Sequence, residues 1–246
     1  MWYTSSNMKL LAPNIFEPFQ EVIASMSLRD ETEPGYLSMI AKGADKTTAS
    51  KNRHRLCQEL GFSPSQLAYP EQTHSDTVHT VTDEYNRREA DALITGQSGW
   101  LLGVTVADCV PVLLYDPFSG SYGAIHSGWR GSAANITGTT VAKLIKEFDA
   151  DPTNITAWVG PAAGEDSYEV DSEIASQFNQ KYSRPNKQDG WLFDNKSVVH
   201  DQLISAGLQE SNIEVSGLDT ITNTELHSAR RDGENSGRML CVIGRA

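Results

Sequence analysis

The sequence predicts a mixed α/β fold of the α+β kind, in one domain that spans residues 1–246. Short apolar runs, typical of strands, are mixed with longer segments in which apolar residues recur at helical spacing. Several strand-like runs follow one another without a helix between them, which indicates hairpins rather than a regular βαβ array. A chain of 246 residues also fits one large core better than two small ones.

The elements of the first half follow from periodicity and from turn residues. A strand is predicted at 22–26, and a helix at 48–60 ends before Gly61, a residue common at helix C-termini. Apolar and β-branched runs then predict strands at 77–81, 92–95, 101–106, 110–115 and 122–126.

The second half continues the mixture of helices and strands. The periodic segment 135–148 predicts a helix that is closed by Asp151 and Pro152. The same criteria then predict a strand at 155–159, a helix at 173–182, a polar surface loop at 181–190, a helix at 198–207, and strands at 213–215 and 240–243.

The charge of the chain limits its partners. With a net charge of −12 the protein repels the nucleic-acid backbone, although a few local arginines can still bind a small phosphorylated or nucleoside ligand. No apolar stretch approaches the roughly 20 residues that cross a bilayer, and the N-terminus lacks the pattern of a signal peptide. We therefore expect a cytoplasmic protein, monomeric or weakly dimeric, with a small-molecule substrate and no nucleic-acid or membrane partner.

The chain has three cysteines, an odd number at wide spacing, which argues against a disulfide framework. Cys57 and Cys241 lie among apolar residues and are expected in the core. Cys109 differs, because it follows Asp108 at the end of an apolar run.

His74, Cys109 and His126 each stand where a predicted strand gives way to a loop. Two imidazoles and a thiolate suffice to hold a catalytic zinc ion with water in the fourth position, and the same donors also suit copper. The residues alone leave other interpretations open: a metal-free Cys–His pair, or a packed cysteine and solvated histidines.

The hairpin between 110–115 and 122–126 decides whether Cys109 and His126 meet. If Asp116 pairs with Ser119, the two residues lie directly opposite each other. A loop that ends on Gly120 makes them diagonal neighbours on the same face, and only the intermediate register separates them. The position of His74 does not follow from spacing.

Six groups of residues, in order along the chain, resemble motifs of the laccase-domain family, whose members are described as polyphenol oxidases, a peptidoglycan-editing factor and purine nucleoside enzymes. They lie at 72–75, 90–95, 105–111, 125–131, 159–170 and 230–238. The resemblance covers roughly residues 20–245. It implies a layered α/β/β/α fold and zinc at the positions of His74, Cys109 and His126. The segment 35–40 departs from it by lacking the usual asparagine.

The resemblance implies a zinc-dependent purine nucleoside phosphorylase, acting on adenosine and inosine and extending to S-methyl-5'-thioadenosine, with adenosine deaminase activity. Zinc would activate water for deamination, while Asp108 shuttles protons, orients a ligand, or stays a solvated carboxylate. Cys109 and His126 would also belong to the catalytic set. For the phosphate, Arg130 and Arg231 in glycine-rich turns are the first candidates, and Arg53 is a further one.

Other functions remain compatible with these residues. A copper-dependent polyphenol oxidase would use the same ligands, but six histidines are too few for a multicopper cluster with additional single sites. A metal-free pair of Cys109 and His126 would hydrolyse an amide or ester, for example in a peptidoglycan precursor. A binding protein without catalysis is the non-enzymatic alternative.

Overall fold

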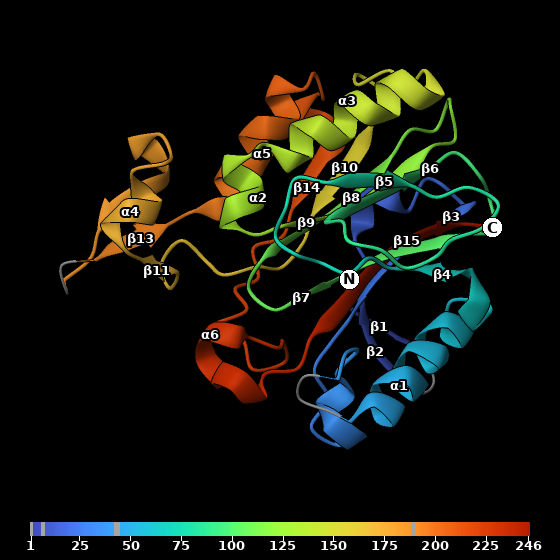
Figure 1. The fold of residues 1–246 in the computed structure, drawn as a ribbon, viewed down its shortest axis with the longest axis horizontal. Helices are drawn as coiled ribbons and strands as arrows, with labels where there is room; N and C mark the ends of the chain where they lie inside the picture. The colour runs from blue at the N-terminus through green and yellow to red at the C-terminus, as the bar shows by residue number, and fades with distance from the viewer. Residues whose placement is uncertain (1, 6–7, 42–44, 188–189) are drawn as a thin grey trace.

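The computed structural model describes residues 2–5, 8–41, 45–187 and 190–246. In these ranges two large sheets pack face to face, and helices cover the outer face of each (Figure 1). Each large sheet combines parallel and antiparallel pairs. The predicted mixed α/β single domain with α/β/β/α layering is therefore confirmed.

The first large sheet joins the N-terminal strands to the last strand of the chain. Its strand order is β1 (Trp2–Ser5), β2 (Met8–Leu11), β3 (Val22–Ser27), β15 (Met239–Arg245), β7 (Leu101–Val106) and β4 (Leu67–Ala68). The second sheet has the order β14 (Ile213–Val215), β10 (Thr156–Val159), β8 (Val110–Tyr115), β9 (Tyr122–Ser127), β6 (Ala92–Thr95) and β5 (Val78–Thr80).

The helices differ in length and position. They are α1 (Lys46–Glu59), α2 (Trp129–Ala133), α3 (Ile136–Phe148), α4 (Ser172–Ala175), α5 (Asn195–Ser205) and α6 (Ala229–Asp232), with 3₁₀ turns at Asn14–Phe16, Pro34–Leu37, Pro64–Gln66, Gln180–Tyr182, Glu210–Asn212 and Gly233–Asn235. Helix α1 packs on the first sheet, and α3 and α5 pack on the second. Within the described ranges, no helix combines the length and apolar character that a membrane span needs.

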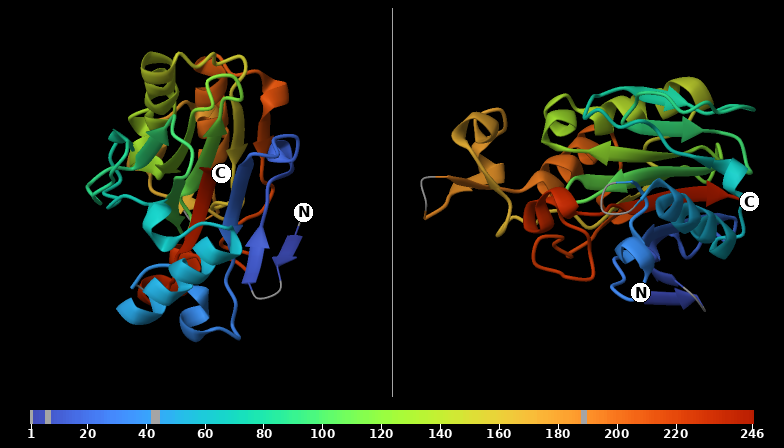
Figure 2. Two further views of the ribbon diagram at one scale, coloured as in Figure 1. Left: turned by 90° about the vertical axis from the view of Figure 1, so that its right-hand side faces the viewer. Right: turned by 60° about the horizontal axis from the view of Figure 1, so that its bottom comes forward.

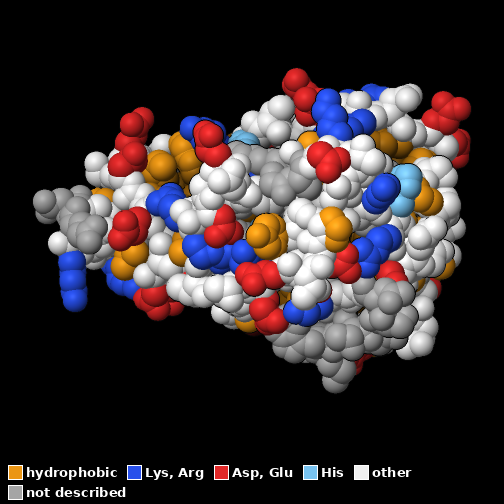
Figure 3. All heavy atoms as spheres, turned by 90° about the horizontal axis from the view of Figure 1, so that it is seen from below, with side chains coloured by type: hydrophobic (Ala, Val, Ile, Leu, Met, Phe, Trp, Pro, Cys, Tyr) orange, Lys and Arg blue, Asp and Glu red, His pale blue; other side chains and the backbone are white. Residues whose placement is uncertain are grey.

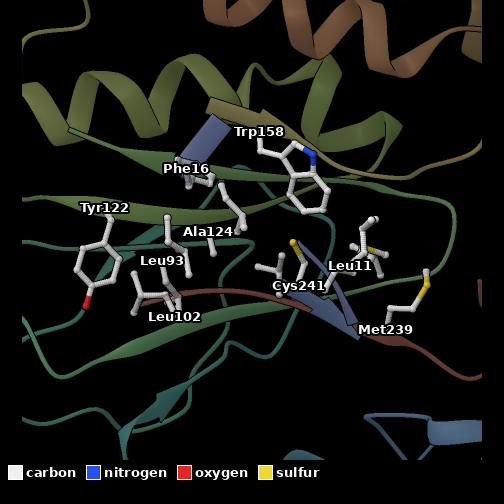
Figure 4. Close-up of a cluster of buried hydrophobic side chains, with 14 of the residues drawn as sticks. Leu11, Phe16, Leu93, Leu102, Tyr122, Ala124, Trp158, Met239 and Cys241 are labelled. Carbon is white, nitrogen blue, oxygen red and sulfur yellow. The ribbon is translucent and has the colours of Figure 1, made fainter. Parts of the chain in front are cut away.

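Alternation along the strands builds the core in separate layers. In β8, Val112 and Leu114 face the helices, whereas Leu113 and Tyr115 face the other sheet. Figure 4 shows the layer between the sheets, where Trp158 of β10 and Cys241 of β15 both lie. Cys57 and Cys241 are buried, as predicted, and the described cysteines are free thiols.

Helix ends follow local hydrogen bonding. Asp45 caps α1 by accepting the N–H groups of Thr47 and Thr48, so the helix begins two residues before the predicted start. Gly61 follows this helix with a φ of 78°, in the left-handed region that favours glycine, as its predicted role requires. Asp194 caps α5 in the same way, which moves that helix three residues upstream of its predicted start.

The predicted helix at 173–182 is wrong beyond its first turn. Helix α4 ends at Ala175, and Asn179 has an extended backbone with its side chain accepting the N–H of Lys181, which starts a separate 3₁₀ turn. The predicted loop at 181–190 instead contains a strand, although residues 188–189 lie outside the described ranges.

A small third sheet forms here, with the order β11 (Glu169–Val170), β13 (Trp191–Phe193) and β12 (Ser183–Pro185). It packs with α4 around its own apolar cluster, which includes Phe193. Figures 1 and 2 show this unit projecting to one side of the layered body. Strands β1 and β2 were likewise not predicted.

His227 is a buried imidazole on the segment that leads into α6. It packs against Gly237, and its Nε2 has no hydrogen-bond partner among the described residues. Burial, and then the charge of Arg29, lowers the pKa of His227 to about 4.

We expect the protein to lose stability as the pH falls from 6.5 to 4. In that window the unfolded chain binds a proton on His227 more readily than the folded chain does, so the free energy of unfolding falls by up to about 3 kcal/mol. The variant His227→Gln should flatten this part of the curve in urea unfolding followed by fluorescence. An unchanged pH dependence in the variant would contradict this assignment.

Candidate metal centre

His74, Cys109 and His126 converge at one place in the structure. Their candidate ligand atoms all lie within 4.8 Å of one another. Cys109 Sγ is 4.0 Å from His74 Nε2, and the two imidazole rings meet edge to face with centroids 4.9 Å apart. His74 therefore lies beside Cys109 and His126, although spacing in the sequence did not show that it would.

The layered fold brings the three residues together. His74 lies on the segment that crosses from β4 in the first sheet to β5 in the second, and Cys109 follows β7 on the crossing to β8. His126 belongs to β9, on the face that also carries Ala124 toward the other sheet. The candidate centre thus lies at one end of the inter-sheet layer.

The hairpin register is the second of the two favourable ones. Pro111 pairs with His126, so Cys109 is diagonal to His126 and not directly opposite it as the shorter turn predicts. The turn is longer because the Asp116 N–H donates to the Ser121 carbonyl and Gly120 adopts a φ of 69°.

Asp91 is the residue that the sequence analysis missed as part of the site. Its carboxylate is buried and lies 2.8 Å from His126 Nδ1, which leaves Nε2 of that ring facing the cluster. It also accepts the backbone N–H groups of Thr73, His74 and Ser75 and the Ser75 hydroxyl. Its position inside the 90–95 motif was the available signal.

This bonding explains an unusual backbone conformation. His74 has a φ of 60°, which is uncommon for a residue with a side chain. Three consecutive N–H groups that converge on one carboxylate hold the segment in that conformation.

Gly128 forms the floor of the cluster. A Cβ atom there would lie 3.0 Å from His74 Cδ2 and 3.1 Å from Cys109 Sγ, closer than ordinary contacts. The glycine therefore lets the backbone after β9 approach two of the candidate ligands.

Charge within the cluster favours a thiolate. Burial raises the pKa of Cys109, but the neighbouring His126 and then His74 outweigh it and lower the pKa to about 6. Burial lowers the pKa of His126, while the Cys109 and Asp91 charges raise it to about 9. Desolvation also opposes ionisation of Asp91, whose pKa nevertheless falls to about 2 through its bonds to His126 and Ser75.

The donor set and its spacing fit a zinc ion. Tetrahedral zinc with Zn–S near 2.3 Å and Zn–N near 2.0 Å places sulfur and nitrogen about 3.5 Å apart. The 4.0 Å between Cys109 Sγ and His74 Nε2 needs a contraction of about 0.5 Å to reach that value, and separations in the cluster, which extend to 4.8 Å, must shorten more. Among the described residues, no other group of three or more potential ligands of this kind is found.

A pocket of about 490 Å³ opens over the cluster. It is lined by Ile40, Gln72, His74, Thr105, Ala107, Asp108, Cys109, His126, Trp129, Arg130, Tyr168, Ala229, Arg230 and Arg238. Asp108 adopts a φ of 83°. Its carboxylate accepts hydrogen bonds from the Thr220 hydroxyl and from the backbone N–H of Arg230. Both oxygens of this predicted site residue are therefore held at the wall.

The arginines of the pocket differ from those chosen on sequence. Arg130 lines it and stacks on Trp129, whereas Arg230 and Arg238 were not chosen. Arg231 is absent from the described lining, because its guanidinium donates to backbone carbonyls from Thr220 to Leu226 and to Asp232. Its neighbour in the sequence, Arg230, lines the pocket instead.

Arg53 lies outside this pocket. It stacks over Tyr69 and donates to the Met39 carbonyl, and it lines a second, adjoining pocket. Tyr168, from the loop before β11, lines the first pocket, and burial together with the Cys109 charge raises its pKa to about 12. Arg230 lies over the ring of this tyrosine.

Residues 37–246 match a family model described as multi-copper polyphenol oxidoreductase laccase. The chain belongs to this family. It is 32% identical to a purine nucleoside phosphorylase of Deinococcus radiodurans over 98% of this chain and 94% of that protein. It is 31% identical to adenosine deaminase RL5 of an unknown prokaryotic organism, over 82% and 84% of the respective chains.

The fold is also similar to that of a solved structure. The crystal structure of YlmD from Geobacillus stearothermophilus superimposes with a TM-score of 0.88 at 29% identity. The match covers 99% of this chain and 98% of YlmD.

Replacing Asp91 by asparagine should weaken zinc binding about 10- to 100-fold. The amide keeps the shape but removes the charge and one acceptor that orient His126 and the 73–75 segment. Competition with a chromogenic chelator measures the affinity. Asp83→Asn, an equal charge change at an exposed carboxylate bonded to Gln97, is the control. Equal zinc affinity of the two variants would refute this role of Asp91.

Gly128→Ala should lower zinc affinity by about tenfold or more, since crowding a packed site costs about 1–3 kcal/mol. The added methyl group would press on His74 and Cys109. Gly217→Ala is the matched control, because nothing lies within 4 Å of a Cβ at that position. Zinc content after dialysis, determined by elemental analysis, should separate the two variants, and equal contents would count against the crowding argument.

Proposed function

We propose that the protein is a metal-dependent purine nucleoside phosphorylase that also deaminates adenosine, within a single domain over residues 1–246. The observation that carries the proposal is the cluster of His74, Cys109 and His126, oriented by Asp91 at the floor of a pocket of small-molecule size. The relatives named for these two activities support it.

We assign zinc to the cluster, held by His74, Cys109 and His126. When bound, the ion supplies Lewis-acid chemistry and lowers the pKa of water toward neutrality. Asp91 fixes the tautomer of His126, because the Nδ1–H group donates a hydrogen bond to the carboxylate. The lone pair of Nε2 is then free to bind a metal ion. Gly128 lets the backbone lie close to His74 and Cys109.

Both reactions also need a group that moves protons, and a polar residue of the pocket can supply it. In deamination, water adds at C6 of the purine and ammonia leaves. In phosphorolysis, the bond from C1' to N9 breaks, phosphate bonds to C1', and the base takes up a proton. Asp108, held by Thr220 and the Arg230 N–H, borders the pocket and is our candidate for moving protons.

The cations of the pocket suit the phosphate, and its aromatic rings suit the purine base. Arg130, Arg230 and Arg238 line it and offer N–H groups to an anion such as phosphate. Trp129 and Tyr168 present aromatic surface on which a purine base can stack.

A second candidate function is Cys–His hydrolysis without a metal. Asp91, His126 and Cys109 form a carboxylate–imidazole–thiolate sequence, and the pKa of the thiol is lowered to about 6 by the imidazole charges that outweigh burial. Such a triad remains active when a strong chelator has removed all metal. Loss of hydrolysis on chelation and its return with zinc would favour the metal centre.

Product analysis tests the leading proposal. Zinc-loaded protein incubated with adenosine should give inosine with or without phosphate, and adenine with ribose 1-phosphate only when phosphate is present. His74→Ala, which removes a candidate ligand, should lower all product formation at least 100-fold. Absence of all three products at full zinc occupancy would overturn the proposal, and oxygen uptake with a phenol under copper loading would favour an oxidase.

A further inference from the structure

A second pocket of about 480 Å³ adjoins the pocket over the metal centre. The two share Ile40, Gln72 and Thr105 as common walls. Each by itself falls in the range of about 300–1,000 Å³ that is usual for small-molecule sites. A ligand over the cluster and a molecule in the second pocket would therefore be neighbours.

The second pocket is positively charged. Its described lining includes Lys46, Arg53 and Arg87, with Glu71 as the carboxylate. Lys46, Ala49 and Arg53 come from one face of α1, at helical spacing. Figure 3, which views the molecule from the side of α1, shows acidic and basic side chains interspersed over the surface. A local excess of cations is notable in a chain with a net charge of −12.

Tyr69 organises two of these cations. The guanidinium carbons of Arg53 and Arg87 lie 5.1 and 4.6 Å from the centroid of its ring. Two like charges gathered on one ring repel each other, and a bound anion would relieve that repulsion. Among the described residues, neither these arginines nor Lys46 forms an ion pair with a carboxylate.

The arginines keep donors available for a ligand. Arg53 Nη1 donates to the Met39 carbonyl, and Arg87 Nη2 is 3.5 Å from the Pro70 carbonyl, a long contact. A guanidinium has five N–H donors, so each side chain retains several. Stacked guanidinium groups with a nearby ammonium suit a tetrahedral dianion, and phosphate binds arginine in a bidentate manner.

We propose that the second pocket is a phosphate-binding subsite, formed by Lys46, Arg53 and Arg87, for a phosphate group next to the nucleoside over the metal centre. The inference rests on the proposed nucleoside substrate and adds a second anion position to that of Arg130, Arg230 and Arg238. The phosphate is either free inorganic phosphate or the 5'-phosphate of a nucleotide.

Calorimetric titration of the zinc-loaded full chain tests this with three probes: adenosine, adenosine 5'-monophosphate and inorganic phosphate. At least one phosphate-bearing probe should bind about tenfold more weakly to Arg87→Gln than to the wild type, since a charge-assisted hydrogen bond contributes about 1.5–3 kcal/mol. Lys46 is the first residue of α1, and Lys46→Gln should give a smaller loss of affinity for the same probe.

Arg88→Gln is the matched control. Arg88 is exposed, bonds the Asn86 carbonyl and is absent from the described lining of the second pocket. A loss confined to inorganic phosphate identifies the free ion as the ligand, and a loss confined to the monophosphate identifies a nucleotide. Equal affinities of wild type, Arg87→Gln and Arg88→Gln for both phosphate probes would overturn the subsite.

Failure of the proposed function gives a different result. In that case no purine product forms, while binding of inorganic phosphate still reports on Arg87 without any turnover. Thermal unfolding of each variant shows whether it folds. If Arg87→Gln does not fold, the phosphate affinity of Lys46→Gln provides the second measurement.

Discussion

One buried carboxylate holds the candidate centre together. Asp91 has no exposed surface, so its charge requires compensation inside the protein. That compensation comes from His126 on one side and from the N–H groups of the 73–75 segment on the other. Because these partners carry two of the three candidate ligands, a single group fixes both the ring of His126 and the backbone of His74.

The parts of the site that depend on local pattern were predictable. Strand alternation and the turn after Asp116 placed Cys109 and His126 on the same face, and the observed register was among those considered. The meeting of His74 with them depends on how two sheets stack, which no spacing in the sequence encodes. The family resemblance supplied that step, together with the layering of the fold.

The unpredicted features have local physical causes. Strands β11 (Glu169–Val170) and β12 (Ser183–Pro185) contain few apolar residues, so neither shows the apolar run that predicts a strand. Arg231 and Arg230 look equivalent in sequence, yet the helical turn of α6 directs the first toward backbone carbonyls and leaves the second at the pocket. Asp91 was visible as a motif residue, but its role depends on bonds to residues up to 35 positions away.

The position of the cluster on the inter-sheet layer links interior packing to metal preference. Two of the candidate ligands stand on chain crossings from one sheet to the other, so the packing between the sheets holds these crossings, and the donor atoms on them, in place. A change in that packing would shift the crossings and with them the donor atoms of the cluster. Selectivity in such an architecture can be tuned from the hydrophobic interior, without changing a ligand.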